Sequence, residues 1–182
     1  MPDWLIAVLK PAGVVIVRLT PVEHTIINKL PAVGVAANNA VTLEEVVEVF
    51  VQANTAIPNY IELEVNPLGT MLDIYLIDTR KPLHYESWNS EKMQWAVHVD
   101  GIVDGKEGDR EWTCEIALPL EDVATATRLP PQPGDRWRVN LYRVERLPDV
   151  AELAWSPTLQ DDFHVLPRMG EIIFTGRRVP KK

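Results

Sequence analysis

Apolar and polar residues alternate most regularly along residues 60–77. The apolar positions are Ile61, Leu63 and Val65 in the first half, and Leu72, Ile74 and Leu76 in the second half. Side chains point alternately to the two faces of a strand, so each half predicts a strand. Asn66-Pro67-Leu68-Gly69 lies between them and is typical of a turn, because Pro67 presets φ and Gly69 tolerates a positive φ. We therefore expect a β-hairpin with one apolar face and one polar face. The polar face is expected to carry Glu62, Glu64, Asn66, Asp73 and Tyr75.

Seven shorter segments also have the pattern of strands, namely residues 13–19, 46–51, 94–100, 111–118, 136–144, 151–155 and 170–174. Residues 46–51 are almost continuously apolar, which predicts a central strand. Trp95, Trp112 and Trp137 share the apolar side of their strands and are expected in the core. Short strands separated by turns predict an all-β fold, an antiparallel two-sheet β-sandwich of jelly-roll-like form, with at most one or two short helices.

Three segments fall outside this pattern. Residues 42–45 fit a capping box, and Pro119 precedes a second possible helical turn. Residues 78–93 form a polar connection of a length that is often functional.

The chain has 182 residues, which fits one domain spanning residues 1–182. Its net charge of -8 argues against nucleic acid and against an anionic membrane as partners, since both would repel it. Cys114 is the single cysteine, so no internal disulfide can form. The N-terminus lacks the basic region of a signal peptide, and no apolar run approaches the roughly 20 residues that a membrane span needs. The cytoplasm is therefore the default expectation, and an extracellular location would require that a leader has been removed.

An ordered series of motifs resembles the family 9 carbohydrate-binding modules and their DOMON-like relatives. It comprises Val-Glu-Val-Phe at 47–50, the hairpin at 60–70, Glu-Trp-Thr-Cys-Glu-Ile-Ala-Leu-Pro at 111–119, residues 134–143, residues 154–158 and residues 163–174. The resemblance covers about residues 44–175. It implies a two-sheet sandwich that binds sugars without catalysis, with structural calcium. The chain departs from the family in residues 1–43 and at Met169, where phenylalanine is frequent. An alternative is therefore a structural or protein-interaction sandwich that has lost its sugar site.

A sugar site needs an aromatic ring for the C–H face of the sugar and polar groups for its hydroxyls. Trp88 lies in the polar connection, where it is either such a platform or an anchor that covers the end of a sheet. Trp155 is either at the rim of such a site or in the hydrophobic core. The polar candidates are Glu62, Glu64, Asp73, Tyr75, Asn140 and Arg143. The four hairpin residues line a groove or form a solvated face. Arg143 binds sugar hydroxyls or forms a buried salt bridge with a glutamate such as Glu64 or Glu115.

No cofactor is required by any motif, although structural calcium is a possibility. Asp100, Asp104 and Asp109 have the oxygen ligands that calcium prefers, while the glycines among them equally indicate a hairpin turn. Because relatives of this sandwich bind haem, a haem-binding redox domain is a further alternative. Its axial ligands would come from Met71, Met93, Met169 and the histidines at 24, 84, 98 and 164. No catalytic constellation emerges, since Cys114 is expected to face inward and the acidic pairs have no distinguishing context.

Overall fold

The structure is a computed structural model that describes residues 5–10, 14–23, 45–79, 84–101, 111–145 and 151–175. Within these ranges, only the backbone is described for 5–10, 14–23, 84–87 and Glu145. The predicted helical turn at 42–45 lies almost entirely outside the described residues.

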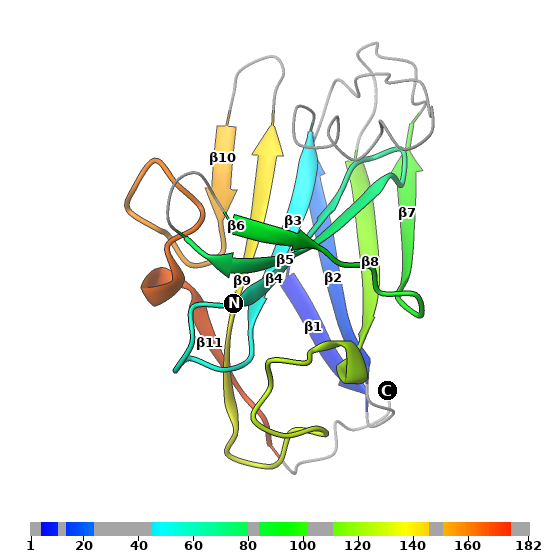
Figure 1. Cartoon of the computed structure of the whole chain (residues 1–182). Helices are drawn as coiled ribbons and strands as arrows, with labels where there is room; N and C mark the ends of the chain where they lie inside the picture. The colour runs from blue at the N-terminus through cyan, green and yellow to red at the C-terminus, as the bar shows by residue number, and fades with distance from the viewer. Residues whose placement is uncertain are drawn as a thin grey trace.

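Two antiparallel sheets face one another (Figure 1). The smaller sheet has the order β1-β2-β8-β7. Its strands are β1 (Leu5–Lys10), β2 (Val14–Glu23), β8 (Glu111–Pro119) and β7 (Gln94–Asp100). The larger sheet has the order β10-β9-β3-β4-β5-β6, and β11 also pairs with β9. Its strands are β3 (Val46–Gln52), β4 (Tyr60–Val65), β5 (Met71–Asp78), β6 (His84–Ser87), β9 (Arg136–Glu145), β10 (Ala151–Ala154) and β11 (Gly170–Ile173). This architecture confirms the predicted all-β sandwich.

The only helical elements among the described residues are two single 3-10 turns, η2 (Leu120–Asp122) and η3 (Leu166–Arg168). Pro119 precedes η2, as expected from its position. The polar connection at 78–93 was wrongly predicted to be a loop throughout, because it contains β6, which pairs with β5. A four-residue edge strand is too short to show a clear alternation.

The main core lies between the sheets. The larger sheet contributes alternate residues of β3, β4 and β9, and β8 contributes Trp112, Cys114, Ile116 and Leu118. The predicted inward positions of β8 are therefore confirmed, as is the burial of Trp137. Trp95 also points inward, since it pairs with Ile116. It is nevertheless 42% exposed, which contradicts the core prediction. The reason is that β7 is an edge strand, where Trp95 donates its indole N–H to the Gly69 carbonyl at 2.9 Å.

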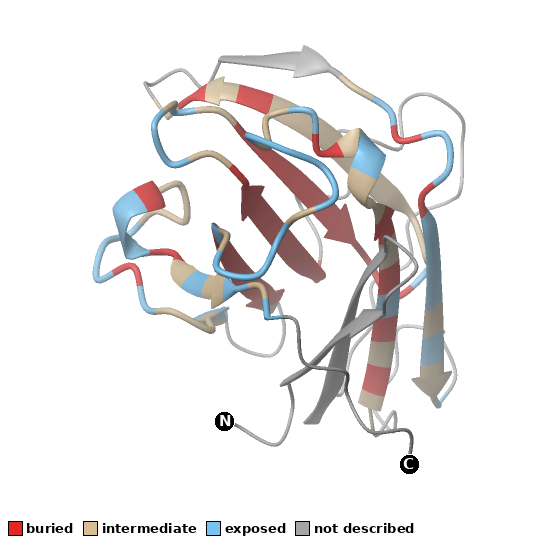
Figure 2. Ribbon diagram, turned by 90° about the horizontal axis from the view of Figure 1, so that it is seen from below, coloured by how far each residue is buried: buried red, intermediate tan, exposed pale blue. Residues whose placement is uncertain are grey.

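The second face of the larger sheet, here called the outer face, is also buried. Phe50, Tyr60, Leu76 and Tyr142 form a cluster there with Leu166 and Met169, which belong to the segment at 155–169. The Phe163 ring stacks on Tyr142, with centroids 4.2 Å apart. As a result every residue of β3 and β4 is buried (Figure 2).

The hairpin of β4 and β5 forms as predicted, but its faces are arranged differently. The Asn66 side chain accepts hydrogen bonds from the backbone N–H groups of Leu68 (3.1 Å) and Thr70 (2.9 Å), and Gly69 has φ 78°. Val65 pairs with Met71, so five residues, 66–70, separate the paired strands. An odd loop length places even-numbered residues of both strands on one face and odd-numbered residues on the other.

The prediction of one shared polar face was therefore wrong. Glu62 and Glu64 lie opposite Ile74 and Leu72 on the outer face. Asp73 and Tyr75 lie opposite Leu63 and Ile61 on the face toward the smaller sheet.

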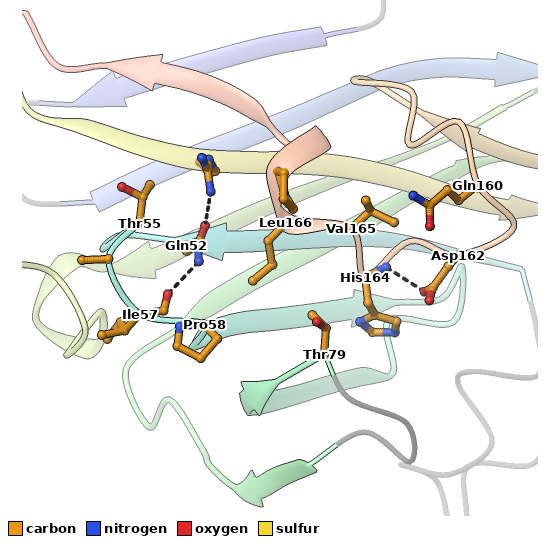
Figure 3. Close-up of a pocket in the computed structure, with 13 residues that line it drawn as sticks. Gln52, Thr55, Ile57, Pro58, Thr79, Gln160, Asp162, His164, Val165 and Leu166 are labelled. Atoms are coloured by element: carbon orange, nitrogen blue, oxygen red, sulfur yellow. Dashed lines mark hydrogen bonds between the residues drawn. The ribbon is translucent and has the colours of Figure 1, made fainter.

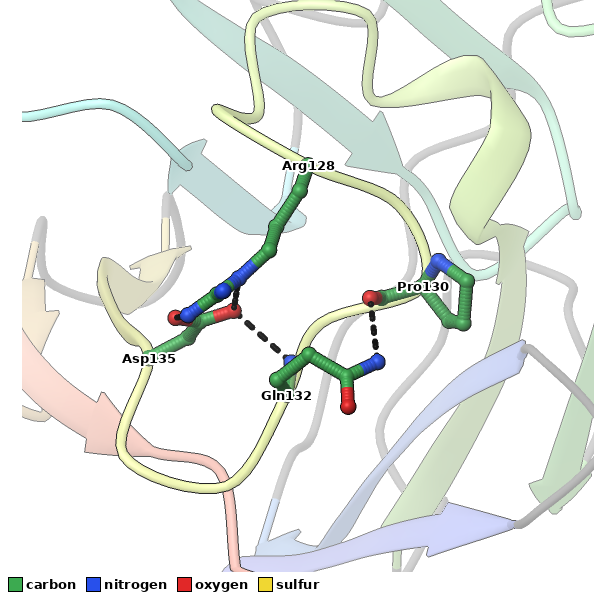
Figure 4. A network of polar contacts seen from close by, with 4 residues as sticks. All are labelled: Arg128, Pro130, Gln132 and Asp135. Carbon is green, nitrogen blue, oxygen red and sulfur yellow. Dashed lines mark hydrogen bonds and ion pairs between the residues drawn. The ribbon is translucent and has the colours of Figure 1, made fainter.

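The loop before β9 is held by its own polar network (Figure 4). Arg128 forms an ion pair with Asp135, whose carboxylate also accepts the Gln132 backbone N–H at 2.7 Å. These contacts lower the pKa of Asp135 to about 2. The network fixes the entry to β9, the strand that carries Arg138 and Asn140.

Candidate functional site

An open pocket of about 580 Å³ lies on the outer face of the larger sheet (Figure 3). Its walls come from the end of β3 with the turn that follows it, from β9, and from the segment at 160–167. The lining residues are Gln52, Thr55, Ala56, Ile57, Pro58, Thr79, Arg138, Gln160, Asp162, His164, Val165, Leu166 and Pro167. Polar side chains with both donors and acceptors converge here beside short apolar ones, which is the usual composition of a small-molecule site.

Gln52 and Arg138 form one end of the pocket. They are paired in register between β3 and β9 and so project from the outer face side by side. The buried Gln52 amide donates to the Ile57 carbonyl at 2.9 Å, which fixes its orientation. Its oxygen accepts a hydrogen bond from Arg138 Nη1 at 3.3 Å. The guanidinium is half-buried and borders the open space.

Asp162 and His164 form the other end (Figure 3). The Asp162 carboxylate accepts the backbone N–H of His164 at 2.9 Å. The His164 Nδ1 lies 2.5 Å from the Tyr60 hydroxyl and 3.9 Å from Glu62 Oε2. Burial, followed by the nearby Glu62 charge, raises the pKa of Tyr60 far above its usual range. Tyr60 therefore keeps its proton, and its hydroxyl shares a hydrogen bond with Nδ1 of His164.

Three glutamates are buried on the outer face, and Glu62 is the one that approaches His164. Glu62 and Glu64 are two residues apart on β4, and Glu48 is directly opposite Glu64 on β3. All three are buried, at 5%, 3% and 7% exposure. Burial raises the pKa of Glu64, partly offset by its hydrogen bond with Glu62. A carboxyl that is neutral beside an ionised one is the usual arrangement when two acids share a buried site.

The residues predicted for sugar binding do not meet at one surface. Glu62, Glu64 and Asn140 are on the buried outer face. The Asn140 amide is used internally, because it donates to the Ser156 carbonyl and accepts the Ser156 N–H, both at 2.9 Å. Asp73 and Tyr75 are half-buried on the opposite face, where Asp73 accepts the Ser90 N–H at 2.8 Å.

The two predicted platforms are also half-buried. Trp88 and Trp155 both pack against the main core. Trp155 lies directly on Gly170, where an added Cβ would be 2.2 Å from the ring. Their role as sugar platforms stays a prediction.

Arg143 is buried between the sheets, where Glu45 supplies its carboxylate. Glu45 Oε1 also accepts the Trp112 indole N–H at 2.7 Å, and the Arg143 guanidinium carbon lies 5.2 Å from the centre of the Trp112 ring. This geometry favours the structural salt bridge over contact with a sugar. Glu115, one of the partners expected from the sequence, is exposed.

The calcium site and the haem site stay predictions. Asp100 is half-buried at the end of β7, while Asp104 and Asp109 lie outside the described residues. Across the side chains that the structure describes, no group of three or more His, Cys, Asp or Glu residues is arranged to hold a metal ion. Met93 and Met169 are buried in different clusters, and Met71 packs against the main core. His98 is exposed, and the side chains of His24 and His84 are not described.

Among the described residues, no helix is long and apolar enough to cross a membrane.

None of the pocket residues was predicted to bind sugar, and only His164 was named at all, as a possible haem ligand. Gln52 and Arg138 carried a weak signal, because each is a polar residue at the same strand parity as Phe50 and Asn140, respectively. Asp162 and His164 lie in a segment without any regular pattern.

Two solved structures have a fold similar to that of this chain. A proposed carbohydrate-binding protein from Bacteroides uniformis ATCC 8492 aligns with 88% of this chain and 71% of its own, at 17% identity and a TM-score of 0.58. A family 9 carbohydrate-binding module from Caldicellulosiruptor kristjanssonii, solved with cellotriose, aligns with 93% of this chain and 75% of its own. The identity there is 12% and the TM-score 0.55. At these identities the likeness establishes a shared fold. No protein-family model and no curated protein sequence matches the chain.

Proposed function

We propose that this chain is a non-catalytic carbohydrate-binding domain whose sugar site is the open pocket on the outer face. The observation that carries the proposal is the pocket itself, with the Gln52 amide, the Arg138 guanidinium and the Asp162 carboxylate around one open space. Amide, guanidinium and carboxylate groups are suited to bidentate hydrogen bonding with neighbouring sugar hydroxyls. The shared fold with a module solved in complex with cellotriose supports the same class of ligand.

Hydrophobic contact with the sugar ring would come from Pro58, Val165 and Leu166, which also line the pocket. Stacking on Trp88 or Trp155 is a separate part of the proposal, since neither tryptophan lines this pocket.

Isothermal titration of the folded chain with glucose, cellobiose and cellotriose tests the proposal. Asp162→Asn removes a charge inside the pocket but keeps an oxygen for the His164 N–H. Asp161→Asn is the matched control, because Asp161 is exposed and does not line the pocket. We expect Asp162→Asn to weaken binding about tenfold to a hundredfold, the contribution of one hydrogen bond to a charged group. Asp161→Asn should leave the affinity unchanged. Trp88→Ala tests the platform in the same titration. Absence of heat with every sugar at millimolar concentration, from a folded protein, would refute the proposal.

A structural or interaction domain without a sugar site is the second candidate function. It is favoured by one specific observation, the packing of both Trp88 and Trp155 against the core. The same titrations separate the two candidates.

A further inference from the structure

Arg138 differs from the other buried or paired arginines that the structure describes. Arg128, Arg136 and Arg143 each form an ion pair with a carboxylate, from Asp135, Glu171 and Glu45, respectively. Within the described residues, the partner of the Arg138 guanidinium is the neutral Gln52 amide oxygen, at 3.3 Å. A half-buried guanidinium is costly unless a charged or strongly polar group compensates it. The exposed Arg168 differs again, because it only approaches a backbone carbonyl.

The surroundings of Arg138 orient it toward a ligand. A guanidinium carries five N–H donors in a planar fork, and the bond to Gln52 uses one of them, on Nη1. Gln52 cannot rotate away easily, because its amide nitrogen is bound to the Ile57 carbonyl. Both side chains line the pocket, so the fork borders open space of a size that accepts a small molecule.

The two ends of the pocket carry opposite charge. The Arg138 and Gln52 end favours an oxyanion, which a guanidinium binds in bidentate fashion. The other end has the Asp162 carboxylate, which accepts hydrogen bonds from hydroxyl groups. A ligand that suits both ends carries one carboxylate and several hydroxyls. A doubly charged phosphate fits less well, since it would meet more repulsion from Asp162 and from the protein's net charge of -8.

We propose that the pocket selects acidic sugars, with Arg138 binding the carboxylate of a uronic acid and Asp162 binding its hydroxyls. This inference rests on the proposed function, because it names the class of sugar for the same pocket. It makes Arg138 the residue that determines specificity between acidic and neutral sugars.

Glucuronate and glucose are a matched pair of ligands, since they differ only in a carboxylate or a hydroxymethyl group on the ring. Titration calorimetry with both, and with acetate as the bare carboxylate, tests the inference. We expect glucuronate to bind at least about tenfold more tightly than glucose, the value of one charge-assisted hydrogen bond. Acetate should bind more weakly than glucuronate. Arg138→Gln should weaken glucuronate binding more than glucose binding, so that the preference for glucuronate is lost.

Arg168→Gln is the matched control, because it removes an exposed arginine that does not line the pocket and only approaches the Pro157 carbonyl. It should preserve the preference for glucuronate. Circular dichroism confirms folding of each variant, and the ratio of affinities in the unaltered protein decides the question even if Arg138→Gln fails to fold.

Equal affinity for glucose and glucuronate would overturn the inference while leaving the proposed function intact. Acetate binding as tight as glucuronate would also overturn it, because the pocket would then recognise a carboxylate and not a sugar. If none of the sugars binds to the folded protein, both the inference and the proposed function are wrong.

Discussion

Replacing Glu45 by alanine should destabilise the fold more than any surface charge change in this protein. Glu45 and Arg143 have side-chain exposures of only 4% and 6%. Burial lowers the pKa of Arg143, and the Glu45 charge opposes this change. Removing the carboxylate takes the Glu45 charge away from a buried cation, which typically costs about 3–5 kcal/mol.

The Trp112 hydrogen bond does not add fully to this cost. Glu45 Oε1 accepts both from Arg143 and from the Trp112 indole N–H, so the two bonds belong to one oxygen. A hydrogen bond to a charged group contributes about 1.5–3 kcal/mol when it is lost alone. The expected loss for Glu45→Ala therefore stays at about 3–5 kcal/mol, and the sum of the separate terms would overestimate it.

Urea unfolding followed by tryptophan fluorescence and circular dichroism measures this free energy. Glu171→Ala is the control, since its ion pair with Arg136 has side chains 47% and 60% exposed. That change should cost less than about 1 kcal/mol. Combining Glu45→Leu with Arg143→Met should restore part of the lost stability, because the desolvation cost of both charges disappears while the buried Trp112 N–H loses its acceptor at a cost of about 1–3 kcal/mol. A Glu45→Ala protein within about 1 kcal/mol of the original would refute the buried-pair argument.

Three further changes have defined outcomes. Because burial raises the pKa of Glu64 in the folded state above its ordinary 4.5, folding is favoured by protonation, and stability should decline as pH rises above 4.5 through the folded pKa. Glu64→Gln should flatten this decline in pH-dependent urea unfolding, and an unchanged slope would contradict the rise of the Glu64 pKa by burial. Gly170→Ala should lower the thermal midpoint and reduce the free energy of unfolding by about 1–3 kcal/mol, because the new Cβ would be 2.2 Å from the Trp155 ring. A stabilised variant would exclude that contact. Burial raises the pKa of the Cys114 thiol to about 12, so a thiol reagent should label it only after unfolding, and rapid labelling of the native protein would show that β8 is not covered.

Most of the described strands were predictable because each of those has a local pattern, whereas β1 and the four-residue β6 were not predicted. β3 is apolar at nearly every position, and it is buried on both faces between β9 and β4. β8 alternates strictly, and its four inward residues enter the main core. Hydrophobic periodicity of this kind involves only residues close together in the sequence, so it can be recognised without knowledge of the fold.

The assignment of faces failed where it depended on one residue of loop length. Counting Asn66–Gly69 as the turn gives four residues, while the pairing of Val65 with Met71 gives five. That single residue decides whether Glu62 joins Asp73 or Ile74 on a face, because strand side chains have a period of two. The turn residues were predicted correctly, but they do not determine which residues of the two strands pair.

The burial of Glu62 and Glu64 could not be predicted for a different reason. Their cover comes from the segment at 155–169, which has no period and includes the single turn η3. Acidic residues at alternate strand positions ordinarily indicate a solvated face. Here Leu166 and Met169 pack over the same face of the sheet, so the alternating acidic residues do not indicate a solvent-exposed face.

Predicting the pocket would have required both the pairing of the strands and the position of the segment at 155–169. Its Gln52 end exists because β3 and β9 pair Gln52 with Arg138, residues 86 positions apart. Its Asp162 end exists because the segment at 155–169 folds back onto the outer face. Neither of these long-range contacts is visible in a local pattern. The one local sign was that β3 and β9 each carry a polar residue on the face where neighbouring residues of the strand are buried. A polar side chain at such a position must find a partner within the fold or leave room for one from outside. For Asn140 that partner is the backbone of Ser156, whereas for Arg138 the fold supplies a neutral amide and an open pocket.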